Sequence, residues 1–115
     1  MKFTVFTPTF NRKELLEKLY KSLQKQTYTD FEWLIVDDGS TDGTGEKVKE
    51  FLEESKLDIK YFYKENGGKQ RAYNFATDKA NGELFICLDS DDEYVENGFE
   101  TILKYWEKYE KNGEI

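Results

Sequence analysis

Three carboxylates crowd the end of an apolar run in the segment ELFICLDSDDEY, residues 83–94. The run Leu84–Leu88 predicts a strand that is covered on both faces, as in parallel sheets. Asp89, Asp91 and Asp92 follow at the carboxyl end of this strand. Carboxylates this close repel and raise one another's pKa unless a cation or hydrogen-bond donors compensate them. Because oxygen ligands suit Mg²⁺ and Mn²⁺, the cluster is a candidate site for either ion.

The rest of the chain alternates between predicted strands and helices. Apolar or alternating runs predict strands over residues 2–8, 33–36, 57–63 and 83–88. Helical spacing of apolar residues, with turn signals between, predicts helices within residues 11–26, 45–55, 67–83 and 99–110. In the second of these, Val48, Phe51 and Leu52 are expected on one apolar face. Short loops between them predict right-handed crossovers and an open, mostly parallel sheet with helices on both faces. We therefore expect a Rossmann-like α/β fold, with residues 1–115 forming a single domain.

Ligands of such sheets bind outside the carboxyl ends of the strands, and this rule selects the candidate residues. The acidic cluster follows the fourth predicted strand at this edge. Other candidates follow a predicted strand or precede a predicted helix there, and they are Pro8, Thr9, Asn11, Asp37, Asp38, Lys69 and Arg71. Carboxylates converging with one or two cationic side chains suit a nucleoside diphosphate held through a divalent metal. The metal would neutralise the pyrophosphate in an otherwise acidic protein.

Charge and composition exclude several other partners. Seventeen lysines and arginines against 24 acids give a net charge of −7, which disfavours non-specific binding to nucleic acid or to an anionic membrane. No apolar run approaches the roughly 20 residues of a membrane span, so we expect no membrane segment and a cytoplasmic location. The lone Cys87 cannot form an internal disulfide, and we expect it to pack as a small hydrophobic residue.

Three other ligand-binding motifs do not fit. Gly68-Lys69 continues into Gln70, so the chain has no phosphate-binding P-loop, and TPTFNR stands where a dinucleotide-binding site has its glycines. The acids after the fourth strand match several ligand positions of a calcium-binding EF-hand loop. However, Tyr94 takes the place of the required glycine, and a strand precedes the loop instead of a helix.

Four motifs, in this order along the chain, resemble the amino-terminal half of a family 2 glycosyltransferase of GT-A fold, from residue 3 to residue 100. They are P-T-F-N at residues 8–11, D-D-G-S-T-D-G-T at 37–44, N-G-G-K at 66–69 and D-S-D at 89–91. A Gln-Thr pair at residues 26–27, ahead of the second strand, also matches the family. One such motif alone would be weak, whereas four ordered motifs on predicted strand ends are specific.

The resemblance implies a role for most of these acids, while Asp37 is expected to be structural support. Asp38 resembles the acid that accepts a hydrogen bond from a ring N–H of the donor's uracil; its alternative role is to cap the following turn. Asp91 resembles the direct metal ligand, and Asp89 the acid near the ribose hydroxyls or the metal's waters. For the last two, helix capping and solvation are the competing interpretation. Asp92 is a possible further contact that orients the loop or the sugar.

The remaining assignments concern nucleotide contacts. The resemblance implies that Pro8 and Thr9 present backbone and hydroxyl groups to the base. Lys69 resembles the lysine or arginine that reaches the nucleotide, and an ordinary solvated loop lysine is the competing interpretation. Asn11 is either a ligand contact or the N-cap of the first helix. Arg71 is a possible contact, but residues 72–74 read A-Y-N where many relatives read A-R-N.

Together these features predict a glycosyltransferase that uses a UDP-sugar, Mn²⁺ or Mg²⁺ and a saccharide acceptor, and the resemblance alone implies an inverting outcome. A nucleotidyltransferase would need a glycine-rich first loop with basic residues, which the chain lacks, and a non-catalytic nucleotide or calcium module is the third possibility. The acids present all serve nucleotide and metal, so we expect the general base to lie in an acceptor-binding half beyond residue 115. The fragment should then be inactive or nearly so, and the full-length protein could lie at the inner face of the membrane.

Overall fold

The computed structural model describes residues 2–54, 57–64, 74, 76–88 and 98–111 of the chain. Strands and helices alternate along most of it, as the apolar patterns predict. The strands are β1 (Phe3–Thr9), β2 (Phe31–Asp37), β3 (Asp58–Tyr63) and β4 (Leu84–Cys87). The helices are α1 (Lys13–Gln24), α2 (Thr44–Glu54) and α4 (Gly98–Lys111), and residues 74 and 76–79 are also helical.

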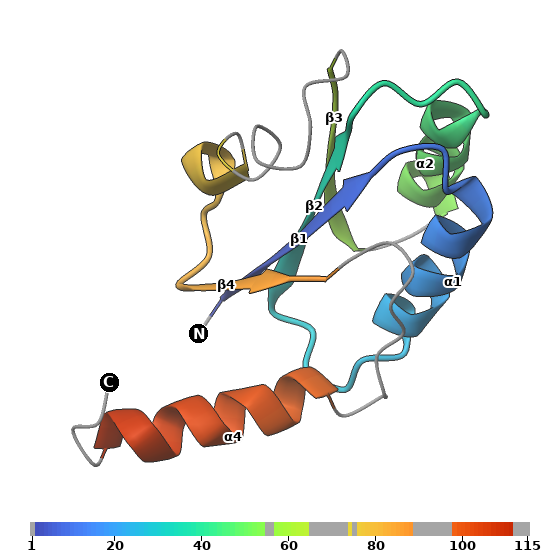
Figure 1. Ribbon diagram of the computed structural model, residues 1–115. Coiled ribbons are helices and arrows are strands. Elements are labelled where there is room, and N and C mark those ends of the chain that lie inside the picture. The colour runs from blue at the N-terminus through green and yellow to red at the C-terminus, as the bar shows by residue number, and fades with distance from the viewer. Residues whose placement is uncertain (1, 55–56, 65–73, 75, 89–97, 112–115) are drawn as a thin grey trace.

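The four strands form one parallel sheet in the order β3-β2-β1-β4. Strands β1 and β2 occupy its centre and pair over their whole length, from Phe3 opposite Phe31 to Thr9 opposite Asp37. Helices α1 and α2 lie side by side on one face, and the helical residues before β4 lie on the other (Figure 1). This arrangement confirms the predicted α/β fold with helices on both faces of a parallel sheet.

The larger part of the core lies between the sheet and α1, α2 and α4. Leu16, Leu19 and Leu23 of α1 are fully buried at helical spacing. Tyr20 stacks on Phe51 of α2 with ring centroids 3.9 Å apart. Burial of each such side chain contributes about 2 kcal/mol, so this face supplies much of the fold's stability.

A smaller core covers the opposite face of the sheet. It consists of Phe6, Leu34, Val36 and Ala76, with Phe62 and Phe85 packed against it. Because side chains alternate along a strand, β1 and β2 supply both cores from neighbouring residues. The two central strands are therefore buried on both faces.

Two sequence expectations about burial are wrong. Cys87 is exposed rather than packed inside a covered strand, and the other residues of β4 are only half-buried. The reason is that β4 pairs only with β1 in the described sheet and so forms its edge. Leu52 was expected on the buried face of α2, yet its side chain is 47% exposed. Val48 and Phe51 already fill the contact with the sheet, and Leu52 lies one position further around the helix.

A buried carboxylate, Glu32, joins four segments near the amino ends of the strands. It accepts hydrogen bonds from Thr4 Oγ1 at 2.6 Å, Asn81 N at 2.6 Å and Lys60 Nζ at 2.7 Å. Burial disfavours the charged form, but these donors outweigh burial and lower the pKa of Glu32 to about 2. Glu32 therefore fixes β1, β3 and the approach to β4 around β2.

The approach to β4 is also fixed by a close contact at Gly82. Its N–H donates to Thr4 Oγ1 at 2.7 Å. A Cβ at Gly82 would lie 2.5 Å from both the backbone nitrogen and the hydroxyl of Thr4. Only glycine lets the chain pass this close to β1 before it enters β4.

We predict that Glu32→Gln lowers the free energy of unfolding by about 3 kcal/mol at pH 7, because an amide offers one oxygen acceptor where the carboxylate offers two. The pKa is lower in the folded state than the ordinary 4.5, so this stabilisation is present above pH 4.5 and is lost as the pH falls towards 2. Urea unfolding at a series of pH values measures both effects. The exposed Glu83→Gln serves as the control, and equal stability of the two variants would contradict this account.

Candidate functional site

Three strands bring their carboxyl ends to one edge of the sheet. Thr9 pairs with Asp37, and Asp37 pairs with Tyr63. Beyond the strands, the N–H of Asp38 donates to the carbonyl of Thr9 and the N–H of Lys64 to that of Asp37, both at 2.9 Å. The loops that follow β1, β2 and β3 therefore begin side by side.

The chain after β4 is held at the same edge. Leu88, the residue before Asp89, donates its N–H to the carbonyl of Phe6 at 2.8 Å. Its carbonyl accepts from Thr7 Oγ1 at 2.7 Å, and this hydroxyl accepts in turn from Trp33 Nε1 at 2.9 Å. The described chain is thus fixed up to the residue that precedes the acidic cluster.

The fully buried Asp37 supports the loop between β2 and α2. One of its oxygens accepts from the N–H of Ser40 at 2.9 Å, and the other accepts from the Tyr61 hydroxyl at 2.6 Å. Burial and this bond raise the pKa of Tyr61 well above its usual range. Gly39 makes the turn with φ of 94°, a conformation that favours glycine. Asp37 therefore has a structural task beside Asp38.

Asn11 connects the loop after β1 with the loop after β2. Its N–H donates to Ser40 Oγ and its side-chain oxygen accepts from the N–H of Thr41, both at 2.8 Å. The expected alternative role of Asn11 as the N-cap of α1 is wrong. Its φ of 51° is left-handed, and Arg12 is the N-cap, with no side-chain capping bond among the described residues. The side-chain oxygen of Asn11, which a helix cap would need as its acceptor, already accepts from the N–H of Thr41.

The structure brings together five of the predicted residues, the supporting Asp37 and the four that follow, and does not describe the rest. Pro8 and Asp38 are half-buried, and Asn11 is exposed. Thr9 is buried, and its hydroxyl has no hydrogen-bond partner within the described structure. The other predicted residues, Lys69, Arg71, Asp89, Asp91 and Asp92, lie outside the described residues.

The described part of the chain contains no cluster of three or more His, Cys, Asp or Glu side chains that could hold a metal ion. The predicted ligands after β4 do not belong to that part. None of the described helices is long and apolar enough to cross a membrane.

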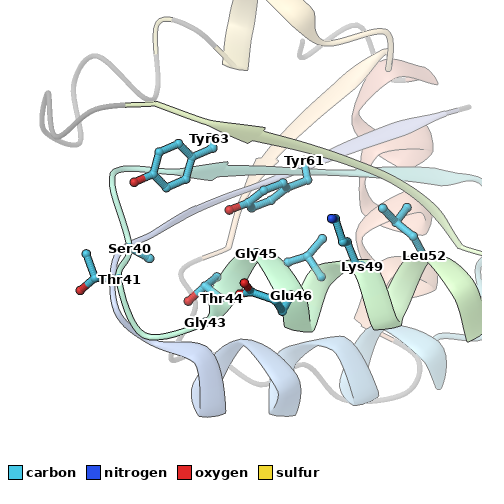
Figure 2. A pocket seen from close by; sticks show the side chains of 11 residues that line it. Ser40, Thr41, Gly43, Thr44, Gly45, Glu46, Lys49, Leu52, Tyr61 and Tyr63 are labelled. Atoms are coloured by element: carbon cyan, nitrogen blue, oxygen red, sulfur yellow. The ribbon is translucent and has the colours of Figure 1, made fainter.

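A groove of about 660 Å³ lies beside the site, between α2 and β3. Figure 2 shows Tyr61 and Tyr63 on its β3 side, with Ser40 and Thr41 at one end. The ring of Tyr61 lines the groove, while its hydroxyl bonds to Asp37. Tyr61 therefore both lines the groove and, through Asp37, supports the loop that begins with Asp38.

Sequence reasoning missed Thr7, Tyr61 and Asp42 as parts of the site's support. Asp42 belongs to the D-D-G-S-T-D-G-T motif, which was a usable signal for it. Thr7 and Tyr61 lie inside strands, and their partners are Trp33 and Asp37 of β2 and Leu88, the residue after β4. No local pattern indicates such partners.

We predict that Tyr61→Phe destabilises the fold by roughly 1–3 kcal/mol, because it leaves an oxygen of buried Asp37 without a donor. The pKa of Tyr61 is higher in the folded state than the ordinary 10.0, so its contribution is present below pH 10 and is lost as the pH rises further. The variant should lack this alkaline loss. Urea unfolding between pH 7 and 11 measures both effects, with exposed Tyr63→Phe as the control. Identical profiles for wild type and Tyr61→Phe would contradict the prediction.

Known proteins resemble this chain along most of its length. The model of the family described as Glycosyl transferase family 2 matches residues 4–115. The chain is 39% identical over 105 residues to a Campylobacter jejuni GalNAc(5)-diNAcBac-PP-undecaprenol beta-1,3-glucosyltransferase, covering 90% of this chain and 34% of that protein. It is 38% identical over 108 residues to Streptococcus pneumoniae glycosyltransferase GlyA, covering 90% of this chain and 15% of that protein.

Solved structures give the same result. Staphylococcus aureus TarS 1–349 in complex with UDP-GlcNAc aligns with a TM-score of 0.87 and 33% identity over 96% of this chain and 32% of that one. The Pyrobaculum calidifontis mannosyltransferase PcManGT in complex with GDP-Man and Mn²⁺ aligns with a TM-score of 0.76 and 32% identity, over 80% and 28% of the two chains. The chain thus spans about a third or less of these proteins. It belongs to glycosyltransferase family 2.

Proposed function

We propose that the carboxyl edge of this sheet binds a UDP-sugar through Mn²⁺ or Mg²⁺, for transfer of the sugar to a saccharide acceptor with inversion. The observation that carries the proposal is the alignment of nearly the whole chain with TarS in complex with UDP-GlcNAc. The alignment covers 96% of this chain, in which Thr9 and Asp38 lie side by side. A second neighbour, in complex with a different sugar nucleotide and Mn²⁺, supports the use of a metal.

In this proposal the base of the nucleotide lies against the ends of β1 and β2. Asp38, held beside Thr9 by its own N–H, accepts a hydrogen bond from a ring N–H of uracil. Pro8 and Thr9 supply backbone and hydroxyl groups, and the Thr9 hydroxyl has no partner of its own within the described chain. Phe10, which is 44% exposed, offers an aromatic ring on which a base can stack.

The diphosphate and the metal belong, in this proposal, to the segments after β3 and β4. Asp91 is the direct metal ligand, Asp89 lies near the ribose hydroxyls or the metal's waters, and Asp92 orients the loop or the sugar. Lys69 contacts the nucleotide, with Arg71 as a weaker candidate. A bound divalent cation would neutralise the charge of the departing diphosphate.

Transfer requires an acceptor hydroxyl that attacks the anomeric carbon from the face opposite the diphosphate. The bond from this carbon to the diphosphate oxygen breaks, and a general base takes the hydroxyl proton. Since the candidate acids are all assigned to nucleotide and metal, we place the base outside residues 1–115 and expect these residues alone to show little or no transfer. The name of the Campylobacter jejuni relative specifies an undecaprenol-linked acceptor, which supports a location at a membrane for the whole protein. We place it in the cytoplasm, at the inner face of that membrane.

We predict that UDP binds in the presence of Mn²⁺ at least about tenfold more tightly than in the presence of a chelator, and more tightly than GDP or ATP. The physical reason is that the metal compensates the repulsion between the diphosphate and an acidic protein. Isothermal titration of the purified chain with the three nucleotides, with and without Mn²⁺, measures both differences.

Two variants test the proposed roles of Asp91 in metal binding and of Asp38 in base recognition. Asp91→Asn should remove most of the metal dependence, and Asp38→Ala should reduce the preference for UDP while leaving the fold intact. Asp78→Asn, at an exposed position, is the matched control and should bind like wild type. Equal affinity for UDP in chelator would contradict the metal site. Binding of GDP or ATP in preference to UDP would favour a nucleotidyltransferase, and binding of Mn²⁺ without any nucleotide would favour a metal-binding module.

A further inference from the structure

We propose that Asn11 and Asp42 are positioning residues for nucleotide binding. They form a clamp that holds the loop after β1 against the loop after β2, and so keep Thr9 and Asp38 side by side. Neither residue needs to touch the ligand for this role. The inference rests on the proposed function, because its purpose is to order the surface that would bind the base.

The first half of the clamp is Asn11. Its backbone N–H and its side-chain oxygen both bond to the loop after β2, at Ser40 and Thr41. Two bonds from one residue define the orientation of the two loops as well as their distance. Asn11 adopts a left-handed φ of 51°, a conformation that Asn tolerates better than most residues do.

The second half of the clamp is Asp42, whose two carboxylate oxygens face different helices. One oxygen accepts from the N–H of Lys13, the first residue of α1, at 3.2 Å. The other accepts from the N–H and the hydroxyl of Thr44, the first residue of α2, at 3.2 and 2.5 Å. First-turn amides have no partner within their own helix, and a negative charge there is favourable. A single side chain therefore joins the amino ends of both helices.

These bonds also keep Asp42 ionised. The hydrogen bond from the Thr44 hydroxyl lowers the pKa of this carboxyl, with further lowering from backbone N–H groups and a smaller opposing effect of burial. Only the ionised form offers both oxygens purely as acceptors, because protonation turns one of them into an O–H donor. An asparagine at this position has one oxygen and one amide donor, so it can accept from one helix but not from both. The position consequently requires a carboxylate.

The clamp lies between the two proposed base-binding segments rather than in either core. Beyond the paired strands, one backbone bond, from Asp38 to Thr9, connects the predicted contacts directly. Asn11 and Asp42 add bonds just outside it, on residues 11–13 and 40–44. Holding both loops before the ligand arrives reduces the ordering cost of binding. Loss of the clamp should therefore weaken nucleotide affinity more than it changes the fold.

The test compares UDP dissociation constants, in Mn²⁺, of wild type, Asp42→Asn, Asn11→Gly and each of these combined with Asp38→Ala, where glycine is chosen because it adopts the left-handed φ of Asn11. We expect each clamp variant to bind UDP about tenfold more weakly, which corresponds to the loss of one or two hydrogen bonds. In the Asp38→Ala background, the same changes should have a smaller effect, because the residue that they position is gone. Urea unfolding verifies that each variant is folded at the titration temperature, and Asp78→Asn again serves as the control.

The outcomes separate the clamp from the proposed function. Wild-type affinity in both folded clamp variants would overturn the clamp alone. Losses that add fully to the loss caused by Asp38→Ala would also overturn it, since a purely structural contribution is independent of Asp38. Absence of UDP binding by the wild-type chain would overturn both proposals. If Asp42→Asn does not fold, Asn11→Gly decides, because glycine adopts the left-handed φ of this position and lacks the side chain that bonds to Thr41.

Discussion

The parallel register between β1 and β2 is the constraint on which both the core and the site depend. It places Phe3 opposite Phe31 at one end and Thr9 opposite Asp37 at the other. A shift by one residue would exchange the two faces of a strand, so that residues packed on α1 and α2 would face the other core. The same shift would separate Thr9 from the loop that carries Asp38. Correct packing of the helices therefore also aligns the proposed binding residues.

Two buried carboxylates stabilise this arrangement, one near the amino ends of the strands and the other at their carboxyl ends. Glu32 joins β1, β3 and the approach to β4 near the amino ends, away from the predicted site. Asp37 lies at the carboxyl edge, where its oxygens bond to Ser40 and Tyr61. The first carboxylate thus contributes to the fold, whereas the second also shapes the loop that presents Asp38. This division agrees with the general location of ligands at the carboxyl ends of parallel strands.

The sequence predicts much of the fold because apolar spacing is a local property. The spacing of the Leu residues in α1 and the apolar run of β2 predict which side chains are buried. The alternation of strands and helices predicts a parallel sheet. It does not report which strand forms the edge, so Cys87 was expected in a covered strand and is exposed. Nor does it report contacts between distant loops: Asn11 and Thr41 are 30 residues apart, and their bond replaces the expected cap. Motif order places Thr9 and Asp38 at one edge, whereas the clamp around them depends on tertiary structure.

The central claim is that this edge of the sheet binds the nucleotide, and an NMR titration of the ¹⁵N-labelled chain with UDP and diamagnetic Mg²⁺ tests it most directly. The account predicts that the largest shifts fall on the amides of Thr9, Asn11, Asp38 and Ser40. Amides near the amino ends of the strands, such as those of Phe31, Asn81 and Gly82, should move little. Saturable shifts confined to the amino edge, or to the groove beside Tyr63, with unchanged Thr9 and Asp38 would contradict it.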